Sequence, residues 1–147
     1  MTCPRVTATR RLEWDSAHRV LRHESKCSTL HGHRYAAELT CEAPELDVVG
    51  RVIDFGVVKQ IVGGWIDANW DHTTLVNWED RRLWEFVSGE SLVYGKRSPF
   101  PFKCEPTAEN IAIHLLGTSN ALLAEFGISV VRVRVYETPN CYAEARP

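Results

Sequence analysis

The chain has 147 residues, of which 44% are hydrophobic and 24% charged, and its formal net charge at pH 7 is -2. This length and composition predict a single globular domain over residues 1–147 and argue against a disordered or fibrous protein. The small net charge offers no basic surface for nucleic acid, and no apolar run approaches the roughly 20 residues that cross a membrane. Residues 1–5 lack the apolar segment of a signal peptide, so we expect a cytoplasmic protein.

The sequence holds an odd number of cysteines and no paired Cys-x-x-Cys spacing. This pattern favours free thiols in a reducing compartment over a disulfide framework. Two of them, Cys41 and Cys141, fall in strand-like runs, where we expect small apolar fillers. Only Cys27 has neighbours that suggest reactivity. The five cysteines are Cys3, Cys27, Cys41, Cys104 and Cys141.

Residues 6–18 alternate between apolar and polar side chains, with Leu12 and Trp14 among the apolar positions. Period-two alternation predicts a half-buried strand. His18 has the parity of the apolar face if the strand persists that far. Residues 20–30 are polar and aperiodic, so we expect a loop, and Cys27 lies in it.

A second strand begins at His31, where His31 and His33 share the parity of Tyr35, Ala37 and Leu39. Alternate strand residues face the same side, and an antiparallel hairpin with residues 6–18 would bring these two imidazoles to His18. Separately hydrogen-bonded core histidines are one interpretation. The other is a zinc site, because three histidines with one open position are typical of catalytic zinc. We predict His18, His31 and His33 as metal ligands, with the Cys27 thiol nearby.

The middle of the chain predicts one helix and one acid–base candidate. Asp54 is a suitable N-cap for a helix whose apolar residues between positions 58 and 66 have helical spacing. The adjacent pair Asp71-His72 follows. Such a pair is either an ordinary surface turn or, near a metal site and a thiol, a general acid–base pair.

Residues 77–105 are the least regular part of the sequence. One or two helical turns fit residues 80–86, and residues 95–97 fit the tip of a small hairpin. Pro99 and Pro101 argue against a central strand there. We therefore expect a mobile or decorative insertion.

The last third of the chain predicts a helix and two strands. Thr107 is a suitable N-cap, an apolar stripe runs to position 126, and Gly127 fits the helix stop. Residues 128–138 alternate again, and residues 141–145 form a short closing strand. Glu137 has the apolar parity, so it either meets a ligand with matching donors or lies past the buried zone. The predicted fold is α+β, a four-stranded antiparallel sheet in the order ββααββ with two helices on one face.

Five short motifs occur in an order that resembles the family of 6-pyruvoyl-tetrahydropterin and 6-carboxy-5,6,7,8-tetrahydropterin synthases. The resemblance covers nearly the whole chain and implies the tunnelling fold. In that fold trimers stack in pairs, so it also implies a homohexamer with active sites at subunit interfaces. Residues 77–105 are longer than in compact members. The motifs are Asp15-Ser16-Ala17-His18, Cys27-x3-His31-Gly32-His33, Asp71-His72, Pro106-Thr107-Ala108-Glu109-Asn110 and Tyr136-Glu137-Thr138.

The resemblance also implies a reaction. Three residues between the cysteine and His-Gly-His resemble the bacterial branch of the queuosine (7-deazaguanine) route, which converts 7,8-dihydroneopterin triphosphate to 6-carboxytetrahydropterin, acetaldehyde and triphosphate. Zn²⁺ would bind the three histidines and Cys27 would act as the base, helped by Asp71 and His72. Glu137 would anchor the pterin ring, with the backbone around Thr107 lining the pocket.

Other functions stay open at this point. The same scaffold could eliminate to 6-pyruvoyltetrahydropterin or cleave the side chain to a 6-hydroxymethyl pterin. A non-catalytic zinc- or pterin-binding module is a further alternative, although simple binding needs no thiol base. A structural zinc domain would want four ligands, commonly with paired cysteines, and the sequence has none.

Overall fold

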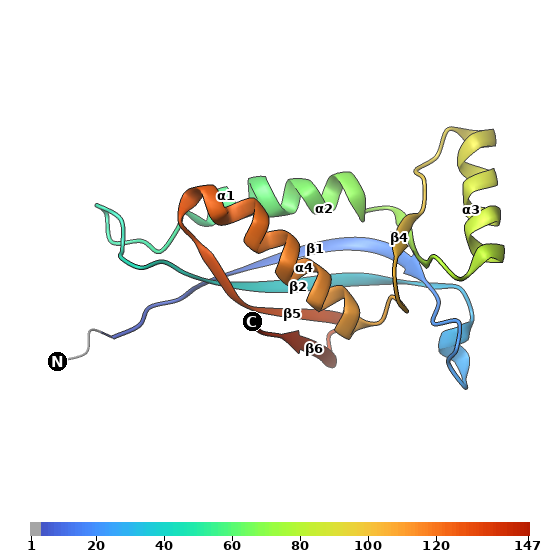
Figure 1. Ribbon diagram of the computed structural model, residues 1–147, viewed down its shortest axis with the longest axis horizontal. Helices are drawn as coiled ribbons and strands as arrows, with labels where there is room; N and C mark the ends of the chain where they lie inside the picture. The colour runs from blue at the N-terminus through green and yellow to red at the C-terminus, as the bar shows by residue number, and fades with distance from the viewer. Residues whose placement is uncertain (1–3) are drawn as a thin grey trace.

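Six strands form one mixed sheet in the computed structural model, which describes residues 4–147 (Figure 1). Their order across the sheet is β4-β3-β1-β2-β5-β6. The four strands β1, β2, β5 and β6 are antiparallel, whereas β3 and β4 are added in parallel beyond β1. The strands are β1 (Ala8–His18), β2 (His31–Glu42), β3 (Thr73–Asn77), β4 (Phe100–Phe102), β5 (Ser129–Thr138) and β6 (Cys141–Ala145).

The prediction of a four-stranded antiparallel sheet is therefore wrong for the sheet as a whole, although the α+β class is correct. The four predicted strands are present and form its antiparallel part. The two additional strands are short, at five and three residues, and β4 contains Pro101. Its place at the sheet edge explains how a proline is tolerated there.

The long hairpin of β1 and β2 places the histidines. Its register runs from Ala8 opposite Cys41 to His18 opposite His31. Trp14 and Tyr35 are opposite each other, fully buried and stacked with ring centroids 5.2 Å apart. The predicted alternation in burial is confirmed in β1, whereas in β2 Ala36 and Thr40 of the opposite parity are buried as well.

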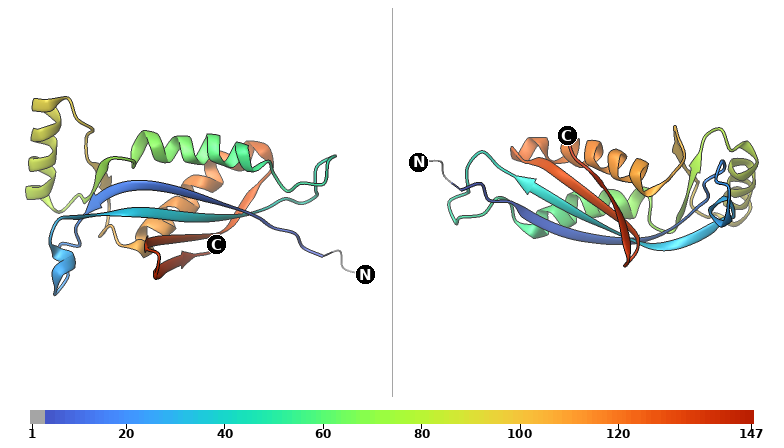
Figure 2. Two further views of the ribbon diagram at one scale, coloured as in Figure 1. Left: turned by 180° about the vertical axis from the view of Figure 1, so that it is seen from behind. Right: turned by 90° about the horizontal axis from the view of Figure 1, so that it is seen from below.

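Helices cover one face of the sheet and leave the other face free of helices (Figure 2). The first predicted helix comprises α1 (Phe55–Val58), a π-helical turn (Lys59–Gly63) and α2 (Gly64–Asn69). The second is α4 (Ala108–Leu123). Asp54 and Thr107 cap these helices as predicted, accepting from Gly56 N and Asn110 N. The core lies between this layer and the sheet and includes Leu39, Ile66, Leu75, Ile111, Leu115 and Val133.

Residues 77–105 contain a third helix, α3 (Arg81–Tyr94), which stands at one end of the molecule (Figure 1). The helical turns predicted at residues 80–86 are present but extend much further, and the hairpin tip predicted at residues 95–97 is wrong. The helix runs for 14 residues from its N-cap Asp80, and Gly95, with a left-handed φ of 62°, ends it where a hairpin tip was predicted. β4 follows and pairs with β3. The interpretation of the whole segment as an insertion stays a prediction.

Across residues 4–147, none of the helices combines the length and the apolar character needed to cross a bilayer.

Candidate metal centre and active-site cleft

Three histidines converge where β1 ends and β2 begins. One ligand nitrogen from each of His18, His31 and His33 lies within 4.8 Å of the others. The ring centroids of His18 are 4.7 Å from His31 and 5.2 Å from His33. The predicted convergence is therefore observed, and it follows from the antiparallel register that places His18 opposite His31.

Backbone carbonyls orient two of the three rings. His18 Nδ1 donates to the carbonyl oxygen of Pro106 at 2.7 Å, and His31 Nδ1 donates to that of Thr29 at 2.6 Å. Each bond places the proton on Nδ1 and leaves Nε2 with a lone pair, which is the arrangement of a histidine that ligates a metal through Nε2. The Nε2 atoms of His18 and His33 are buried and have no hydrogen-bond partner.

Burial favours the neutral form of two of the three imidazoles. It is the largest of the effects that lower the pKa of His18 to about 4; His31 and His33 act in the same direction, whereas the hydrogen bond to Pro106 opposes the shift. The pKa of His33 is also lowered, by burial and then by His31. Neutral imidazoles with buried, unpartnered nitrogens are costly unless something binds them. The donor set therefore fits a cation that prefers nitrogen ligands, such as Zn²⁺.

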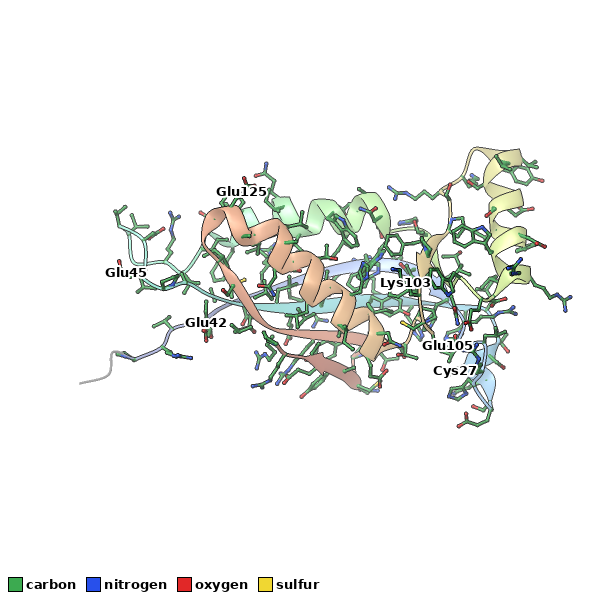
Figure 3. The ribbon with its side chains drawn as sticks, viewed as in Figure 1. Cys27, Glu42, Glu45, Lys103, Glu105 and Glu125 are labelled. Carbon is green, nitrogen blue, oxygen red and sulfur yellow. The ribbon has the colours of Figure 1, made fainter. Side chains whose placement is uncertain are left out.

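A cleft of about 350 Å³ opens beside the cluster. It brings together the thiol, the carboxylate and the helix N-terminus that the sequence predicted at the site, namely Cys27, Glu137 and Thr107. Cys27 lies in the loop between β1 and β2, and Figure 3 shows it at one end of the molecule. The lining is His18, Val20, His23, Cys27, His31, Thr107, Ala108, Glu109, Glu137, Cys141, Tyr142 and Ala143.

Glu137 faces inward, as its parity predicted. Its Oε1 lies 3.7 Å from His18 Nε2, and its side chain is 27% exposed. Burial raises the pKa of Glu137, and the nearby Glu109 raises it further, whereas His31 opposes the shift. A half-buried carboxylate without a strong positive partner is suited to a ligand that brings N–H donors.

Asp71 and His72 lie apart from this cleft and do not line it. His72 Nδ1 is 2.8 Å from Asp71 Oδ2, and the His72 side chain is 73% exposed. The pair is fixed to β1, because Asp71 Oδ1 accepts from the Asp15 N–H at 2.9 Å and the His72 N–H donates to the Asp15 carbonyl at 2.7 Å. His72 has an unusual φ of 55°, and the hydrogen bond from its N–H to the Asp15 carbonyl accompanies this conformation. Within one chain, the predicted acid–base pair is therefore an exposed, ordered surface group.

Cys141 and Glu109 are among the cleft residues that were not assigned to the site from the sequence. Cys141 is exposed and lines the cleft, so the prediction that it fills the core is wrong, whereas Cys41 is buried as expected. Cys141 is the first residue of the edge strand β6 and faces the cleft, whereas Ala145 at the other end of the strand is buried in the core. Glu109 belongs to the motif Pro106-Thr107-Ala108-Glu109-Asn110, but the resemblance assigned it no role. Its position two residues after Thr107 was the available signal. Cys3 lies outside the described residues.

Fold and site together define an α+β protein in which three histidines with the donor set of a metal site lie beside a thiol-containing cleft. A sequence model of the family described as "6-pyruvoyl tetrahydropterin synthase" matches residues 7–147. The chain belongs to this family.

Relatives and solved structures agree with this membership. The chain is 38% identical to a 6-carboxy-5,6,7,8-tetrahydropterin synthase of Rickettsia bellii, over 95% of this chain and 99% of that one. It is 32% identical to the protein of that name in Bacillus subtilis, over 82% of this chain and 70% of that one. An uncharacterized Wolinella succinogenes protein superposes with a TM-score of 0.81 at 22% sequence identity, over 98% of this chain and 99% of that one. The Caenorhabditis elegans 6-pyruvoyl tetrahydropterin synthase superposes with a TM-score of 0.68 at 18% sequence identity, over 98% of this chain and 96% of that one.

Proposed function

We propose that this protein is a zinc-dependent 6-carboxytetrahydropterin synthase. It would convert 7,8-dihydroneopterin triphosphate to 6-carboxy-5,6,7,8-tetrahydropterin, acetaldehyde and triphosphate, as a step of 7-deazaguanine (queuosine-type) biosynthesis. The observation that carries the proposal is the name shared by four relatives at 36–38% identity over 95% of the chain. The convergence of His18, His31 and Cys27 on one cleft supports it.

The residues of the cleft have separable roles in this proposal. The Glu137 carboxylate accepts hydrogen bonds from the pterin ring and fixes its orientation. The start of α4 at Thr107 and Ala108 forms the wall against which the ring lies. Cys27 takes a proton from the substrate side chain. Ground-state binding and proton transfer are thereby assigned to different groups.

His18, His31 and His33 would hold the zinc through their Nε2 atoms. When bound, a zinc ion with three imidazole ligands leaves one position open and acidifies a hydroxyl group placed there. The hydrogen bonds from Nδ1 of His18 and His31 to backbone carbonyls keep these rings in the required tautomer. Because burial lowers the pKa of His18 and of His33, these two rings favour the neutral form that binds a metal.

We further propose that Asp71 and His72 act in the cleft of a neighbouring subunit, within a homohexamer of two trimers. β3 pairs only with Ser16–His18 of β1, which leaves most of that β1 edge without a partner strand among residues 4–147. β6, which carries cleft residues, is an edge strand of the sheet, at the opposite side from β4. Pairing of β6 with a neighbour's β1 would satisfy both edges. It would also bring the neighbour's Asp71 and His72, which are bonded to Asp15 of β1, towards this cleft.

The alternative product is 6-pyruvoyltetrahydropterin. The family description and the C. elegans structure carry that name, and the three-histidine cleft would serve either reaction. The relatives at 36–38% identity favour the carboxylated product. A non-catalytic pterin-binding module would have no use for a thiol in the cleft.

A product assay tests the proposal. Purified zinc-loaded protein is incubated with 7,8-dihydroneopterin triphosphate, and the pterin and aldehyde products are identified by mass spectrometry. Acetaldehyde with 6-carboxytetrahydropterin is the expected result. A pyruvoyl product without acetaldehyde would establish the alternative. Absence of turnover at full zinc occupancy would support the binding module.

A further inference from the structure

The loop that carries Cys27, residues 19–30, is attached to side chains of residues 77–105. The Arg19 guanidinium donates to both carboxylate oxygens of Asp80, at 2.5 and 2.6 Å. The backbone N–H groups of Leu21 and Arg22 donate to the two carboxylate oxygens of Glu105, at 3.1 and 3.2 Å. We refer to Arg19, Asp80 and Glu105 as the loop clamp.

Asp80 is a rigid anchor for this loop. Its side chain is only 4% exposed. Its Oδ1 also accepts from the Leu83 N–H at 3.2 Å, so the carboxylate that holds the loop is the N-cap of α3. The hydrogen bonds from Arg19 hold the pKa of Asp80 below its usual range. A two-pronged bond between a guanidinium and a buried carboxylate fixes orientation as well as distance.

Glu105 is anchored from the opposite side. Its carbonyl oxygen accepts from the Asn110 side-chain amide at 2.9 Å and from the Thr107 N–H at 2.8 Å, which ties it to the start of α4. The next residue, Pro106, orients His18. Figure 3 labels Glu105 and Cys27 close together at one end of the molecule. The loop is therefore fixed to the same short segment that orients a predicted metal ligand.

Among residues 4–147, one backbone hydrogen bond connects the clamped stretch to Cys27. Val20 lies between Arg19 and Leu21, both of which are held, and its N–H donates to the Cys27 carbonyl oxygen at 2.9 Å. Val20 and Cys27 both line the cleft. Residues 24–26, just before Cys27, are exposed. The position of the thiol thus depends on the clamped stretch and on this one closing bond.

We propose that Arg19, Asp80 and Glu105 are positioning residues that fix the Cys27 thiol in the cleft. None of the three lines the cleft, so each acts through the loop. Residues 77–105 then belong to the active-site structure, although their irregular sequence predicts no such role. The catalytic part of this inference rests on the proposed function, whereas the ordering of the loop does not.

The test variants are Asp80→Asn and Glu105→Gln. Asparagine is as good an N-cap as aspartate, so Asp80→Asn preserves α3 and removes only the charged partner of Arg19. The matched control is Asp54→Asn. Asp54 also caps a helix and pairs with an arginine, Arg51, at 2.9 Å, but it contacts neither the loop nor the cleft.

Two measurements separate loop order from catalysis. Limited trypsin digestion reports opening of the loop through cleavage after Lys26, because proteolysis needs a locally unfolded chain. Steady-state kinetics with 7,8-dihydroneopterin triphosphate report thiol placement, and metal analysis confirms that zinc is retained. For both test variants we expect faster cleavage after Lys26, a roughly ten- to hundredfold lower kcat and little change in KM. Asp54→Asn should match the wild type in every measurement.

Wild-type cleavage after Lys26 in both test variants would overturn the inference, whatever the enzyme makes. Faster cleavage with wild-type kcat would overturn the catalytic part alone. An inactive wild-type protein would refute the proposed function, and the digestion would still decide whether the clamp orders the loop. If Asp80→Asn fails to fold, Glu105→Gln decides by itself, because Glu105 caps no helix.

Discussion

The carbonyl oxygen of Pro106 accepts a hydrogen bond from Nδ1 of His18 at 2.7 Å. This bond joins the end of β1 to the residue two positions before α4, 88 positions along the chain. The second ring nitrogen, Nε2, is thereby directed at His31 and His33. Because the acceptor is a backbone carbonyl, the orientation of His18 is a property of the fold rather than of a neighbouring side chain.

The histidine cluster predicts loss of metal when a single ligand is removed. His31→Ala should lose both zinc and turnover, with a fall in zinc affinity greater than the roughly 10- to 100-fold that outer contacts of a metal site cost. Metal analysis after dialysis against a chelator measures the effect. His23→Ala is the control, because His23 lines the same cleft but lies outside the cluster. Retention of zinc by His31→Ala would remove His31 from the ligand set.

Cys27 should be needed for turnover and not for metal. The cluster of His18, His31 and His33 is complete without sulfur. Cys27→Ala is therefore expected to keep its zinc and to lose about 100- to 10,000-fold in kcat, the range typical of a removed general base. Cys141→Ala tests whether any thiol in the cleft would serve, and it should retain activity. Loss of zinc from Cys27→Ala would instead make Cys27 a ligand.

Glu137 should matter for binding of the pterin ring. Glu137→Gln keeps the shape of the side chain and removes the charge that accepts hydrogen bonds. Hydrogen bonds to a charged group contribute about 1.5–3 kcal/mol, so affinity for 7,8-dihydroneopterin should fall roughly 10- to 100-fold by titration calorimetry. Glu125→Gln, at the opposite end of the molecule from Cys27 in Figure 3, is the control. Unchanged affinity in Glu137→Gln would refute the anchoring role.

Periodicity predicted the part of the fold that holds the metal cluster. In β1 the alternate residues that face the helices are buried, and Tyr35 lies opposite Trp14 on the same face of β2. The pattern of Leu12, Trp14 and Tyr35 therefore determines which way His18, His31 and His33 point. β3 and β4 are short, and they pair at the edge of the sheet. Their length and position leave no alternation to detect, and α3 buries only Leu83 among its residues, so its apolar stripe is weak.

The order of the motifs predicted which residues form the cleft better than it predicted where each of them lies. Cys27, Thr107 and Glu137 all line the cleft, yet nothing in the sequence states that Asp71 and His72 face elsewhere in a single chain. That outcome depends on the parallel pairing of β3 with β1, a long-range contact. The hydrogen bond between Arg19 and Asp80 could not be predicted from the sequence either, because it is a long-range contact between residues 61 positions apart.

The separation of His72 from Cys27 predicts complementation between two inactive variants. If Asp71 and His72 act in a neighbour's cleft, an oligomer that mixes Cys27→Ala with His72→Ala chains contains some intact sites. An intact site needs one chain that retains Cys27 and a neighbour that retains His72. Random mixing in equal amounts meets each condition in about half of the cases, so it would restore about a quarter of the wild-type rate. The measurement is the activity of co-expressed, differently tagged chains purified through both tags. Failure to exceed the separate variants would place the pair outside the neighbour's site.

The Asp80–Arg19 pair should also contribute stability that depends on pH. The hydrogen bonds from Arg19 hold the pKa of the Asp80 carboxyl below its usual range. A group whose pKa is lower in the folded protein than in the unfolded chain stabilises the fold above its unfolded pKa, about 3.9 for aspartate, and loses that contribution as pH falls through the folded pKa. Asp80→Asn should therefore lower the free energy of unfolding by about 1–3 kcal/mol at pH 7. Urea titrations across pH should show this difference constant above about pH 5 and shrinking below about pH 4. Asp54→Asn, whose ion pair is half exposed, should differ from the wild type by no more than about 1 kcal/mol. A difference for Asp80→Asn that persists unchanged below pH 3 would mean that packing, and not the charge of Asp80, supplies the stability.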